Sequence, residues 1–270
     1  MPIDASPRLS PASAPSIDLW LAFEAEITDP LLLRRLALLL GEPEHLQHQR
    51  FRAAADQHRY LVTRALVRTV LSRYAPVAPH EWLFAPTAHG RPEIAPSIVE
   101  HCREAEGLCF NISHTRGLVV VAVCRHRALG VDVETLPLLD EPDEVVANFF
   151  SPTEREAFAR APASMRAERF GEYWTFKESY IKARGEGLSL PLDRFSIHLP
   201  DTQSVGLSID APFAHEAERW LFWQFKPTPH HLLAVCSESQ QGDVPSLTLK
   251  QAVPTVSEQL LDLPLLRHST

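Results

Sequence analysis

Two short stretches of the sequence place carboxylates where they could bind a metal ion. In Gly130-Val-Asp-Val-Glu134, valines alternate with Asp132 and Glu134, so a strand here would turn both carboxylates to one face. In residues 172–184, Glu178 and Lys182 stand one helical turn apart. If this helix docks against the end of the strand, three carboxylates converge and repel one another. We therefore expect Asp132, Glu134 and Glu178 to be ligands of a divalent cation, Mg²⁺.

Each of these patterns also has an ordinary structural explanation. An isolated Asp-x-Glu is more often an exposed strand face, and Glu178 with Lys182 could be a surface ion pair that stabilises the helix weakly. Two of the chain's four lysines fall in this helix. Lys182 is placed to reach a phosphate oxygen, whereas Lys177 points to another side and is either a surface residue or a participant. We expect Trp174 to pack in the core.

The strand and the helix need a scaffold, and the sequence predicts one of mixed α and β structure. In the first half, the patterns predict strands at 17–23, 109–112 and 118–124, and helices at 30–40 and from 45 to 74. In the second half, they predict helices at 144–150, from 151 onward and at 172–184, and strands at 130–134, 194–199, 205–209, 220–225 and 231–236. Ser151, followed by proline and an acid in the first turn, is typical of a helix start, and Gly185 of a helix end.

The chain divides into two halves with an extension at each end. Residues 42–68 and 151–182 share a similar order of acidic, aromatic and basic residues, a weak sign of duplication, with the break near 125–130. We therefore expect an N-terminal half at 17–127 and a C-terminal half, with the metal site, at 128–236. Residues 1–16 have the composition of a disordered leader. Residues 237–270 are expected to be a tail or loosely packed extension.

Composition excludes several classes of protein. A chain of 270 residues that is 45% hydrophobic can bury one large or two modest cores. It has neither an apolar run long enough to span a membrane nor a secretory signal pattern, so we expect a cytoplasmic protein that does not bind membranes. The net charge of −8 argues against nucleic acid as a partner. The four cysteines lack metal-ligand spacing and are expected to be buried or incidental thiols.

One segment is strongly basic within this acidic chain. Residues 48–73 contain six arginines and a single acid, Asp56. Such a segment suits an anionic ligand or partner, although a solvated helix face would have the same composition. Arg64 and Arg68 are the residues that we expect to face an acidic partner.

Four ordered motifs resemble one known family. Gly130-Val-Asp-Val-Glu134 and Trp174-Thr-Phe-Lys-Glu-Ser-Tyr-Ile-Lys182 resemble the two signatures of the 4′-phosphopantetheinyl transferases, and residues 150–158 and 185–192 resemble the surfactin-synthetase-activating (Sfp) type of that family. The resemblance implies an α+β fold of two similar α/β halves related by a pseudo-twofold, with the cofactor in the cleft between them. It also implies a monomer that moves the phosphopantetheine arm of coenzyme A to a serine hydroxyl of an apo acyl or peptidyl carrier protein, with Mg²⁺, releasing 3′,5′-ADP.

The resemblance also implies roles for individual residues. Asp132, Glu178 and Lys182 would be catalytic. The motif around Asn111, Ser113 and His114 would contact the phosphates of coenzyme A, together with Lys182. The cofactor-binding set is completed by the Thr87–Pro92 loop, through Thr87, Gly90, Arg91 and Pro92, and by Arg59, which matches the family arginine for the 3′-phosphate. Arg91 stands where the family usually has lysine, and residues 44–49 lack the lysines that often precede that arginine.

Three questions stay open at this point. Glu178 is either a metal ligand or the base that accepts the serine proton, because a carboxylate on a metal has lowered basicity. Another Mg²⁺-dependent phosphoryl-transfer enzyme could use the same three acids, although it would not need the Asn111–His114 and Gly90–Pro92 loops. A coenzyme-A-binding module without catalysis would tolerate loss of Glu178, which is present here.

Overall fold

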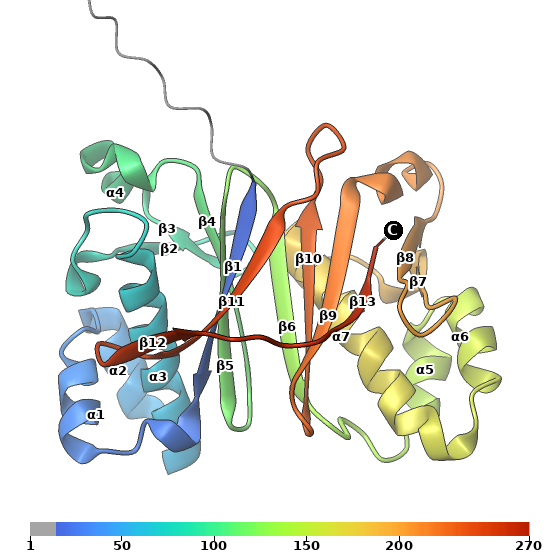
Figure 1. Cartoon of the computed structure of the whole chain (residues 1–270), viewed down its shortest axis with the longest axis horizontal. Coiled ribbons are helices and arrows are strands. Elements are labelled where there is room, and N and C mark those ends of the chain that lie inside the picture. The colour runs from blue at the N-terminus through green and yellow to red at the C-terminus, as the bar shows by residue number, and fades with distance from the viewer. Residues whose placement is uncertain (1–14, 270) are drawn as a thin grey trace, which may run out of the picture.

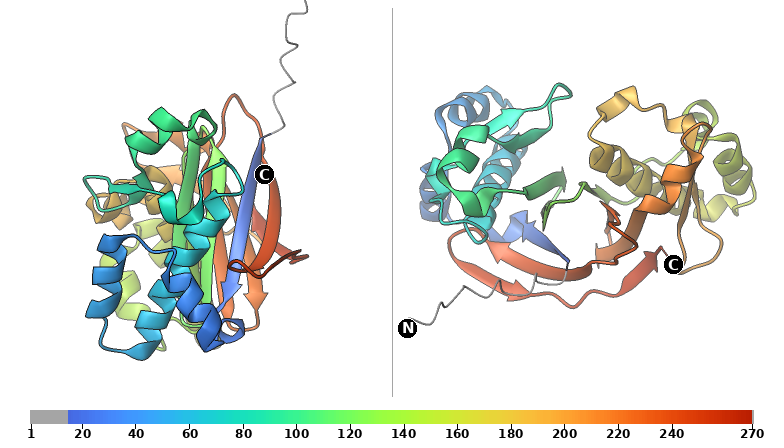
Figure 2. Two further views of the ribbon diagram at one scale, coloured as in Figure 1. Left: turned by 90° about the vertical axis from the view of Figure 1, so that its left-hand side faces the viewer. Right: turned by 90° about the horizontal axis from the view of Figure 1, so that it is seen from above.

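The computed structural model describes residues 15–269, and its elements form two units that lie side by side (Figure 1). In each unit helices cover one face of a β-sheet, and both sets of helices lie on the same side of the sheets (Figure 2). The leader predicted for residues 1–16 falls, up to residue 14, outside the described residues. The predicted end of the leader at residue 16 is wrong, because strand β1 (Ser16–Phe23) begins there.

The N-terminal unit carries its helices between the first strand and a hairpin. Its helices are α1 (Pro30–Ala37), α2 (Glu42–Arg50), α3 (Ala54–Leu71) and α4 (Pro96–His101), and its later strands are β2 (Phe84–Pro86), β3 (Pro92–Ile94), β4 (Leu108–Thr115) and β5 (Leu118–Arg125). The long helix predicted from 45 to 74 is two helices, because the backbone turns extended at Phe51 and Ala53. The Phe51 ring packs on Tyr60 of α3, with ring centroids 5.2 Å apart.

The C-terminal unit repeats this plan. Its elements are β6 (Leu129–Thr135), α5 (Asp143–Phe149), α6 (Pro152–Ala159), α7 (Arg166–Arg184), β7 (Phe195–His198), β8 (Gly206–Ile209), β9 (Trp220–Thr228) and β10 (His231–Glu238). The predicted start of α6 is confirmed, since the Ser151 hydroxyl accepts a hydrogen bond from the N–H of Glu154 at 3.2 Å. Gly185, with a φ of +71°, ends α7 in the left-handed conformation that glycine adopts without strain.

The same strand order appears in both units. In the N-terminal unit β1 lies beside β5, and β5 lies beside β4. In the C-terminal unit β6 lies beside β10, and β10 lies beside β9. Each unit also places its longest helix, α3 or α7, before a two-stranded hairpin, β2-β3 or β7-β8. This repeated connectivity agrees with the expected pair of similar α/β halves, and the predicted α+β class is confirmed.

The C-terminal segment is not the loose tail that the sequence predicted. Strand β11 (Ser246–Val253) pairs in parallel with β1, β12 (Ser257–Leu260) pairs with β11, and β13 (Leu265–His268) pairs with β9 of the other unit. The segment thereby crosses the face of the sheets opposite the helices (Figure 2). The physical reason is that β1 and β9 would otherwise be sheet edges with unpaired backbone groups, which these short strands satisfy.

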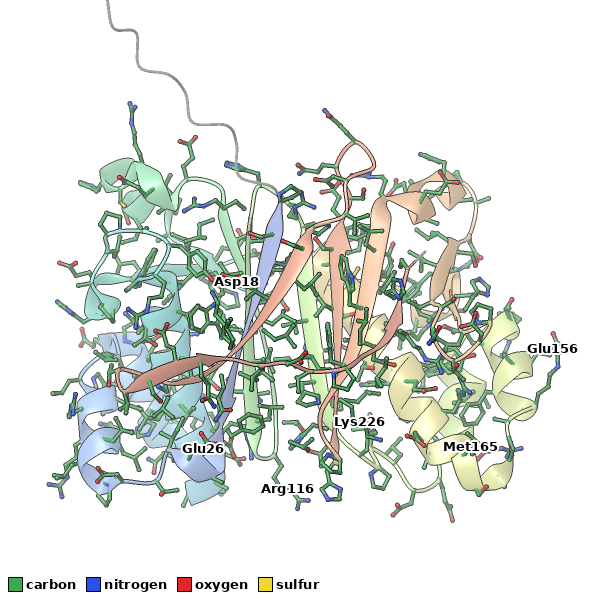
Figure 3. The ribbon with its side chains drawn as sticks, in the orientation of Figure 1. Asp18, Glu26, Arg116, Glu156, Met165 and Lys226 are labelled. Atoms are coloured by element: carbon green, nitrogen blue, oxygen red, sulfur yellow. The ribbon has the colours of Figure 1, made fainter. Side chains whose placement is uncertain are left out.

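Buried apolar side chains form a core under the helices of each unit and another where the two sheets meet. The core between the sheets contains Leu19 of β1, Val120 of β5, Val133 of β6 and Val235 of β10. Figure 3 shows Arg116 at the tip of the β4–β5 hairpin, away from this core. No helix within residues 15–269 is both long and apolar enough to span a membrane.

Candidate active site

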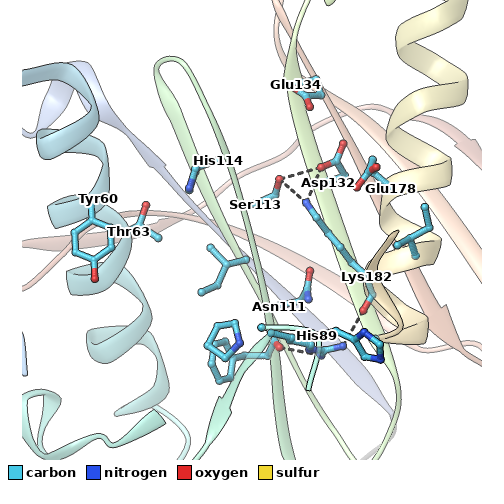
Figure 4. A pocket seen from close by; sticks show the side chains of 18 of the residues that line it. Tyr60, Thr63, His89, Asn111, Ser113, His114, Asp132, Glu134, Glu178 and Lys182 are labelled. Atoms are coloured by element: carbon cyan, nitrogen blue, oxygen red, sulfur yellow. Dashed lines mark hydrogen bonds and ion pairs between the residues drawn. The ribbon is translucent and has the colours of Figure 1, made fainter. Parts of the chain in front are cut away.

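A cleft of about 870 Å³ opens between α3 and β4 of the first unit and β6 and α7 of the second. Figure 4 shows Asp132 and Glu178 on the wall opposite Tyr60 and Thr63. Of the residues predicted for the site, ten line the cleft: Gly90, Arg91, Pro92, Asn111, Ser113, His114, Asp132, Glu134, Glu178 and Lys182. Tertiary structure therefore brings together residues from four separate stretches of the chain.

Asp132 is the centre of a small hydrogen-bonded cluster. The residue is 3% exposed, and its Oδ1 accepts hydrogen bonds from Lys182 Nζ at 2.7 Å and from the Ser113 hydroxyl at 3.1 Å. Lys182 also donates to the Ser113 hydroxyl at 3.0 Å. The other carboxylate oxygen, Oδ2, is buried without a hydrogen-bond partner within the described residues. A buried, unpartnered charged oxygen is costly, so this atom marks a place for a cation or donor.

Glu134 and Glu178 flank this cluster from β6 and α7. Burial, and then repulsion from Asp132, raises the pKa of Glu134 to about 7. Burial, followed by the same repulsion, also raises the pKa of Glu178. The positive charge of Lys182 acts against both shifts. The three carboxylates therefore interact electrostatically in a region of reduced solvent.

The expected meeting of the three acids is looser than predicted. Nowhere in residues 15–269 do three or more His, Cys, Asp or Glu side chains lie close enough to form a ready-made metal site. At Asp132 one carboxylate oxygen is held by Lys182 and Ser113 instead. A three-carboxylate ligand set thus remains a prediction.

Side chains of β4 fix the strand that carries the acids. The Asn111 amide oxygen accepts the N–H of Val131 at 2.9 Å, and the Ser113 hydroxyl accepts the N–H of Val133 at 3.2 Å. The Thr115 hydroxyl accepts the N–H of Thr135 at 3.2 Å. Alternate side chains on one face of β4 thus replace a partner strand along the edge of β6, and they hold Asp132 and Glu134 between them.

The approach of α7 to β6 depends on Gly130. A Cβ atom there would lie 2.0 Å from the Ser179 carbonyl oxygen and 2.4 Å from the Ala183 nitrogen. Only glycine allows this backbone contact, and the contact brings the side of α7 that carries Glu178 and Lys182 against the strand of Asp132. The glycine of the sequence motif therefore serves packing.

Lys177 has a structural role. It is neither a surface residue nor a residue of the cleft lining, the two alternatives that the sequence left open. Its ammonium group is fully buried and bonds both carboxylate oxygens of Glu154, at 2.8 and 2.7 Å, and the Phe195 carbonyl at 3.0 Å. Glu154 also accepts the N–H groups of Ser151 and Ile197. This network joins α6, α7 and β7, so Lys177 fixes the helix while its neighbour Glu178 faces the cleft.

The loop at 87–92 reaches the cleft through its arginine. Arg91 donates from Nη1 to the Lys182 carbonyl at 2.8 Å and from Nη2 to the Phe110 carbonyl at 3.1 Å, so its guanidinium joins the two units. Thr87 does not line the cleft; its hydroxyl accepts the Arg91 N–H at 3.2 Å and closes the turn. Gly90 supplies the positive φ of +81° in that turn.

Arg59 also lies outside the lining of the cleft. Its Nε pairs with Glu24 at 2.7 Å, and its Nη1 lies 3.3 Å from Asp56. His114 does line the cleft and remains exposed. Desolvation by the cleft walls, and then the charges of Arg59 and Lys182, lower the pKa of the His114 imidazole. We therefore expect a neutral ring at pH 7.

The prediction that Arg64 and Arg68 face an acidic partner is wrong at Arg68. Arg68 is 2% exposed and pairs with Glu44 at 2.7 Å, and it donates to the Pro79 carbonyl at 2.9 Å. Arg64 pairs with the same carboxylate and lines the cleft. Burial of Glu44 within α2 demands these partners, so Arg68 is not free to meet a protein surface, whereas Arg64 stays partly exposed in the cleft.

Several residues of the cleft were missed from the sequence. Trp174 packs against the core of the C-terminal unit, as predicted, and also lines the cleft, as do Tyr60, Thr63, His89, Phe110, Ile112, Ile181, Gly185 and Gly187. The spacing of three of these residues in the sequence could have indicated them. Tyr60 and Thr63 are one turn apart on α3, and Ile112 shares a face of β4 with His114.

Comparison with known proteins gives matches over both units. Residues 31–126 match the family model described as 4′-phosphopantetheinyl transferase, N-terminal, and residues 128–236 match that of the 4′-phosphopantetheinyl transferase superfamily. The chain is 33% identical over 190 residues to the 4′-phosphopantetheinyl transferase Sfp of Bacillus subtilis, covering 70% of this chain and 78% of the relative. It is 29% identical over 203 residues to HetI of a Nostoc species, covering 75% and 80%.

Proposed function

The chain belongs to the 4′-phosphopantetheinyl transferase family and transfers the phosphopantetheine group to carrier proteins; from this premise we propose a Mg²⁺-dependent reaction in the cleft. Coenzyme A is the donor, and the acceptor is the serine hydroxyl of an apo acyl or peptidyl carrier protein. The observation that supports this most directly is the buried Asp132 carboxylate: Lys182 holds one of its oxygens, and the other has no hydrogen-bond partner among residues 15–269.

The residues of the cleft fit a hard divalent cation. Mg²⁺ favours one or two carboxylates together with phosphate oxygens and water, so it does not need three protein ligands in place beforehand. Asp132 offers Oδ2, which has no hydrogen-bond partner within residues 15–269, and the carboxylates of Glu134 and Glu178, whose pKa values are raised first by burial and then by Asp132, lie in the same cleft. When bound, Mg²⁺ would neutralise charge on the diphosphate of coenzyme A and polarise the phosphorus for attack.

The transfer itself exchanges one P–O bond for another. The serine oxygen forms a bond to the β-phosphorus, and the bond from that phosphorus to the bridging oxygen breaks, releasing 3′,5′-ADP. In our proposal Glu178 accepts the serine proton without being a ligand of the ion, because burial raises its pKa whereas coordination would lower its basicity. Lys182 lies at 2.7 Å from Asp132 and would donate to the phosphate oxygens as their charge develops.

The remaining polar residues of the cleft would orient coenzyme A. His114 offers a ring N–H, and Gly90 and Pro92 shape a loop that lines the same cleft. The guanidinium of Arg91 and the side chains of Asn111 and Ser113 hold the walls at the junction of the units. Thr87 and Arg59 support this arrangement from outside the lining, Thr87 through the turn of the loop and Arg59 through its charge near His114.

The test is direct. The protein is incubated with an apo carrier protein, coenzyme A and Mg²⁺, and the carrier is weighed by intact mass spectrometry. We expect the carrier to gain the phosphopantetheine mass at its serine, and to gain nothing when a chelator removes Mg²⁺. Asp132→Asn and Glu178→Gln should each lower kcat by about 10²-fold or more.

A matched control separates chemistry from folding. Glu168→Gln changes an exposed glutamate of the same helix, α7, and should keep wild-type kcat. Unmodified carrier across several carrier proteins would overturn the proposed substrate, and undiminished activity in chelator would overturn the role of Mg²⁺. Undiminished activity of Glu178→Gln would remove Glu178 as the base.

We propose that the enzyme acts as a cytoplasmic monomer on protein and coenzyme A alone, without nucleic acid or membrane. The support is that one chain supplies the whole lining of the cleft from both of its units. Analytical ultracentrifugation of the active protein should give a single species near 30.3 kDa. Activity confined to a dimeric species would refute this part of the proposal.

A further inference from the structure

Away from the cleft chemistry, two cysteines lie opposite each other on neighbouring strands. Cys109 of β4 and Cys124 of β5 are register partners in this antiparallel pair. Residues directly opposite in such a pair have Cα atoms about 4.5–5.5 Å apart, within the range of about 4.4–6.8 Å over which a disulfide can form. Both are free thiols in this structure. The backbone therefore needs little movement to join them.

The two thiols differ in their surroundings. Cys109 is partly exposed, whereas Cys124 is 4% exposed. A hydrogen bond between the thiols lowers the pKa of Cys109 to about 6 and raises that of Cys124 well above its usual range. The backbone N–H of Arg127 and the charge of Arg91 add to the effect on Cys109. At neutral pH these shifts favour a thiolate at the partly exposed Cys109, opposite a protonated thiol at Cys124.

We propose that Cys109 and Cys124 form an oxidisable dithiol, in which Cys109 reacts first with hydrogen peroxide and Cys124 then closes an intramolecular disulfide. The Cys109 thiolate attacks one peroxide oxygen, an S–O bond forms, and the O–O bond breaks to release hydroxide, which takes up a proton as water. The Cys124 sulfur then attacks Cys109, the S–S bond forms, and the second hydroxide leaves with the Cys124 proton as water. The thiols lose two electrons, and peroxide becomes two waters.

The position of the pair gives the disulfide a structural consequence. Cys124 Sγ lies 3.5 Å from the Arg127 carbonyl oxygen, so this thiol contacts the segment that leads from β5 to β6. That segment is where the chain passes from one unit to the other. A bond between Cys109 and Cys124 would therefore cross-link the β4–β5 hairpin at its end next to this crossing.

The other two cysteines serve as internal controls. Cys102 is partly exposed and follows α4, where its thiol lies 3.5 Å from the Glu104 carboxylate. Cys236 is fully buried and pairs across the strands with Phe222 and Gly130. Neither has a cysteine opposite it in the described sheets. We expect oxidation to spare both under conditions that close the pair.

The experiment counts thiols after brief treatment of the folded, full-length protein with hydrogen peroxide. The sample is quenched in acid, denatured and alkylated, and then analysed by intact and peptide mass spectrometry. We expect two of the four thiols to escape alkylation, a mass lower by about 2 Da before alkylation, and a peptide cross-link between Cys109 and Cys124 that dithiothreitol reverses. Cys109 should be the first thiol to react, because its lowered pKa leaves much of it as thiolate at pH 7.

Variants decide between the outcomes. Cys102→Ser should form the same cross-link at the wild-type rate. Cys124→Ser should leave Cys109 as a sulfenic acid that dimedone traps, and Cys109→Ser should leave Cys124 unmodified. Four alkylated thiols after treatment, or a cross-link that involves Cys102 or Cys236, would overturn the proposal. The same treatment in urea should give mixed pairings, which ties the specificity to the folded sheet.

Discussion

The Asn111 side-chain oxygen accepts a hydrogen bond of 2.9 Å from the backbone N–H of Val131, so a strand of one unit holds the strand of the other that carries Asp132. Asn111 is 7% exposed, and Ser113 and Thr115 continue the same contacts along β4. The wall of the cleft with the acids is thereby attached to the opposite unit by side chains, one residue from the site of proposed chemistry.

Asn111→Ala should destabilise the protein by about 1–3 kcal/mol, because the buried N–H of Val131 loses its acceptor. Urea denaturation followed by circular dichroism measures the change. Asn111→Asp keeps an acceptor oxygen but should lose less than Asn111→Ala only at acid pH, because its ionised carboxylate would be a buried, uncompensated charge. Thr115→Val, at the more exposed end of the row, should cost less than Asn111→Ala; equal losses would mean that burial does not decide the effect.

Lys177→Met should cost about 3–5 kcal/mol, because it leaves the fully buried Glu154 carboxylate without its cation. Adding Glu154→Gln removes the uncompensated charge while keeping an acceptor for the N–H of Ile197, so the double variant should be more stable than Lys177→Met alone. Urea unfolding of the four proteins of this cycle measures the coupling. Simple additivity would show that the two side chains do not act as a pair.

The metal-free protein should lose stability as pH rises from 4.5 to 7. The pKa of Glu134 is about 7 in the folded protein and near 4.5 when unfolded, so the folded state binds the proton more tightly. Its stabilising effect is full below pH 4.5 and is lost as pH rises through 7, by about 1–3 kcal/mol. In chelator, Glu134→Gln should match wild type at pH 4.5 and exceed it at pH 8. A wild-type curve that Glu134→Gln reproduces at both pH values would contradict this.

Arg91→Lys introduces the lysine that is usual at this position in the 4′-phosphopantetheinyl transferase family. It should nevertheless lower the free energy of unfolding of this protein. A guanidinium can bridge the Phe110 and Lys182 carbonyls, but an ammonium at the same place can reach only one of them well. We expect a loss of about 1 kcal/mol in urea unfolding. A gain in stability, or none, would show that the bridge between β4 and α7 is dispensable.

Mg²⁺ should raise the unfolding temperature of wild type and leave that of Asp132→Asn unchanged. A ligand at a hundred times its Kd stabilises the native state by about 2.7 kcal/mol. Differential scanning calorimetry with and without a chelator measures this. Glu168→Gln is the matched control and should respond like wild type. An equal shift in Asp132→Asn would place the cation away from the free Asp132 oxygen.

Much of the fold follows from local patterns. The alternation of Val131 and Val133 with acids, the Ser151 helix start and the Gly185 helix end each depend on neighbouring residues, and the structure has all three as predicted. Residues 246–268 escaped prediction because they become strands by pairing with the edges of β1 and β9, and short strands of this kind need not show a strong alternation of their own.

The sequence by itself determined the family resemblance, the α+β class and the set of acids and cations that meet in the cleft, because motifs and periodicity are local properties. Only the tertiary structure decided how those charges are used. A buried charge needs a partner of opposite charge. Lys177 therefore pairs with Glu154, Arg68 with Glu44 and Lys182 with Asp132. Those partners lie 23, 24 and 50 residues away in sequence, and no local pattern specifies them.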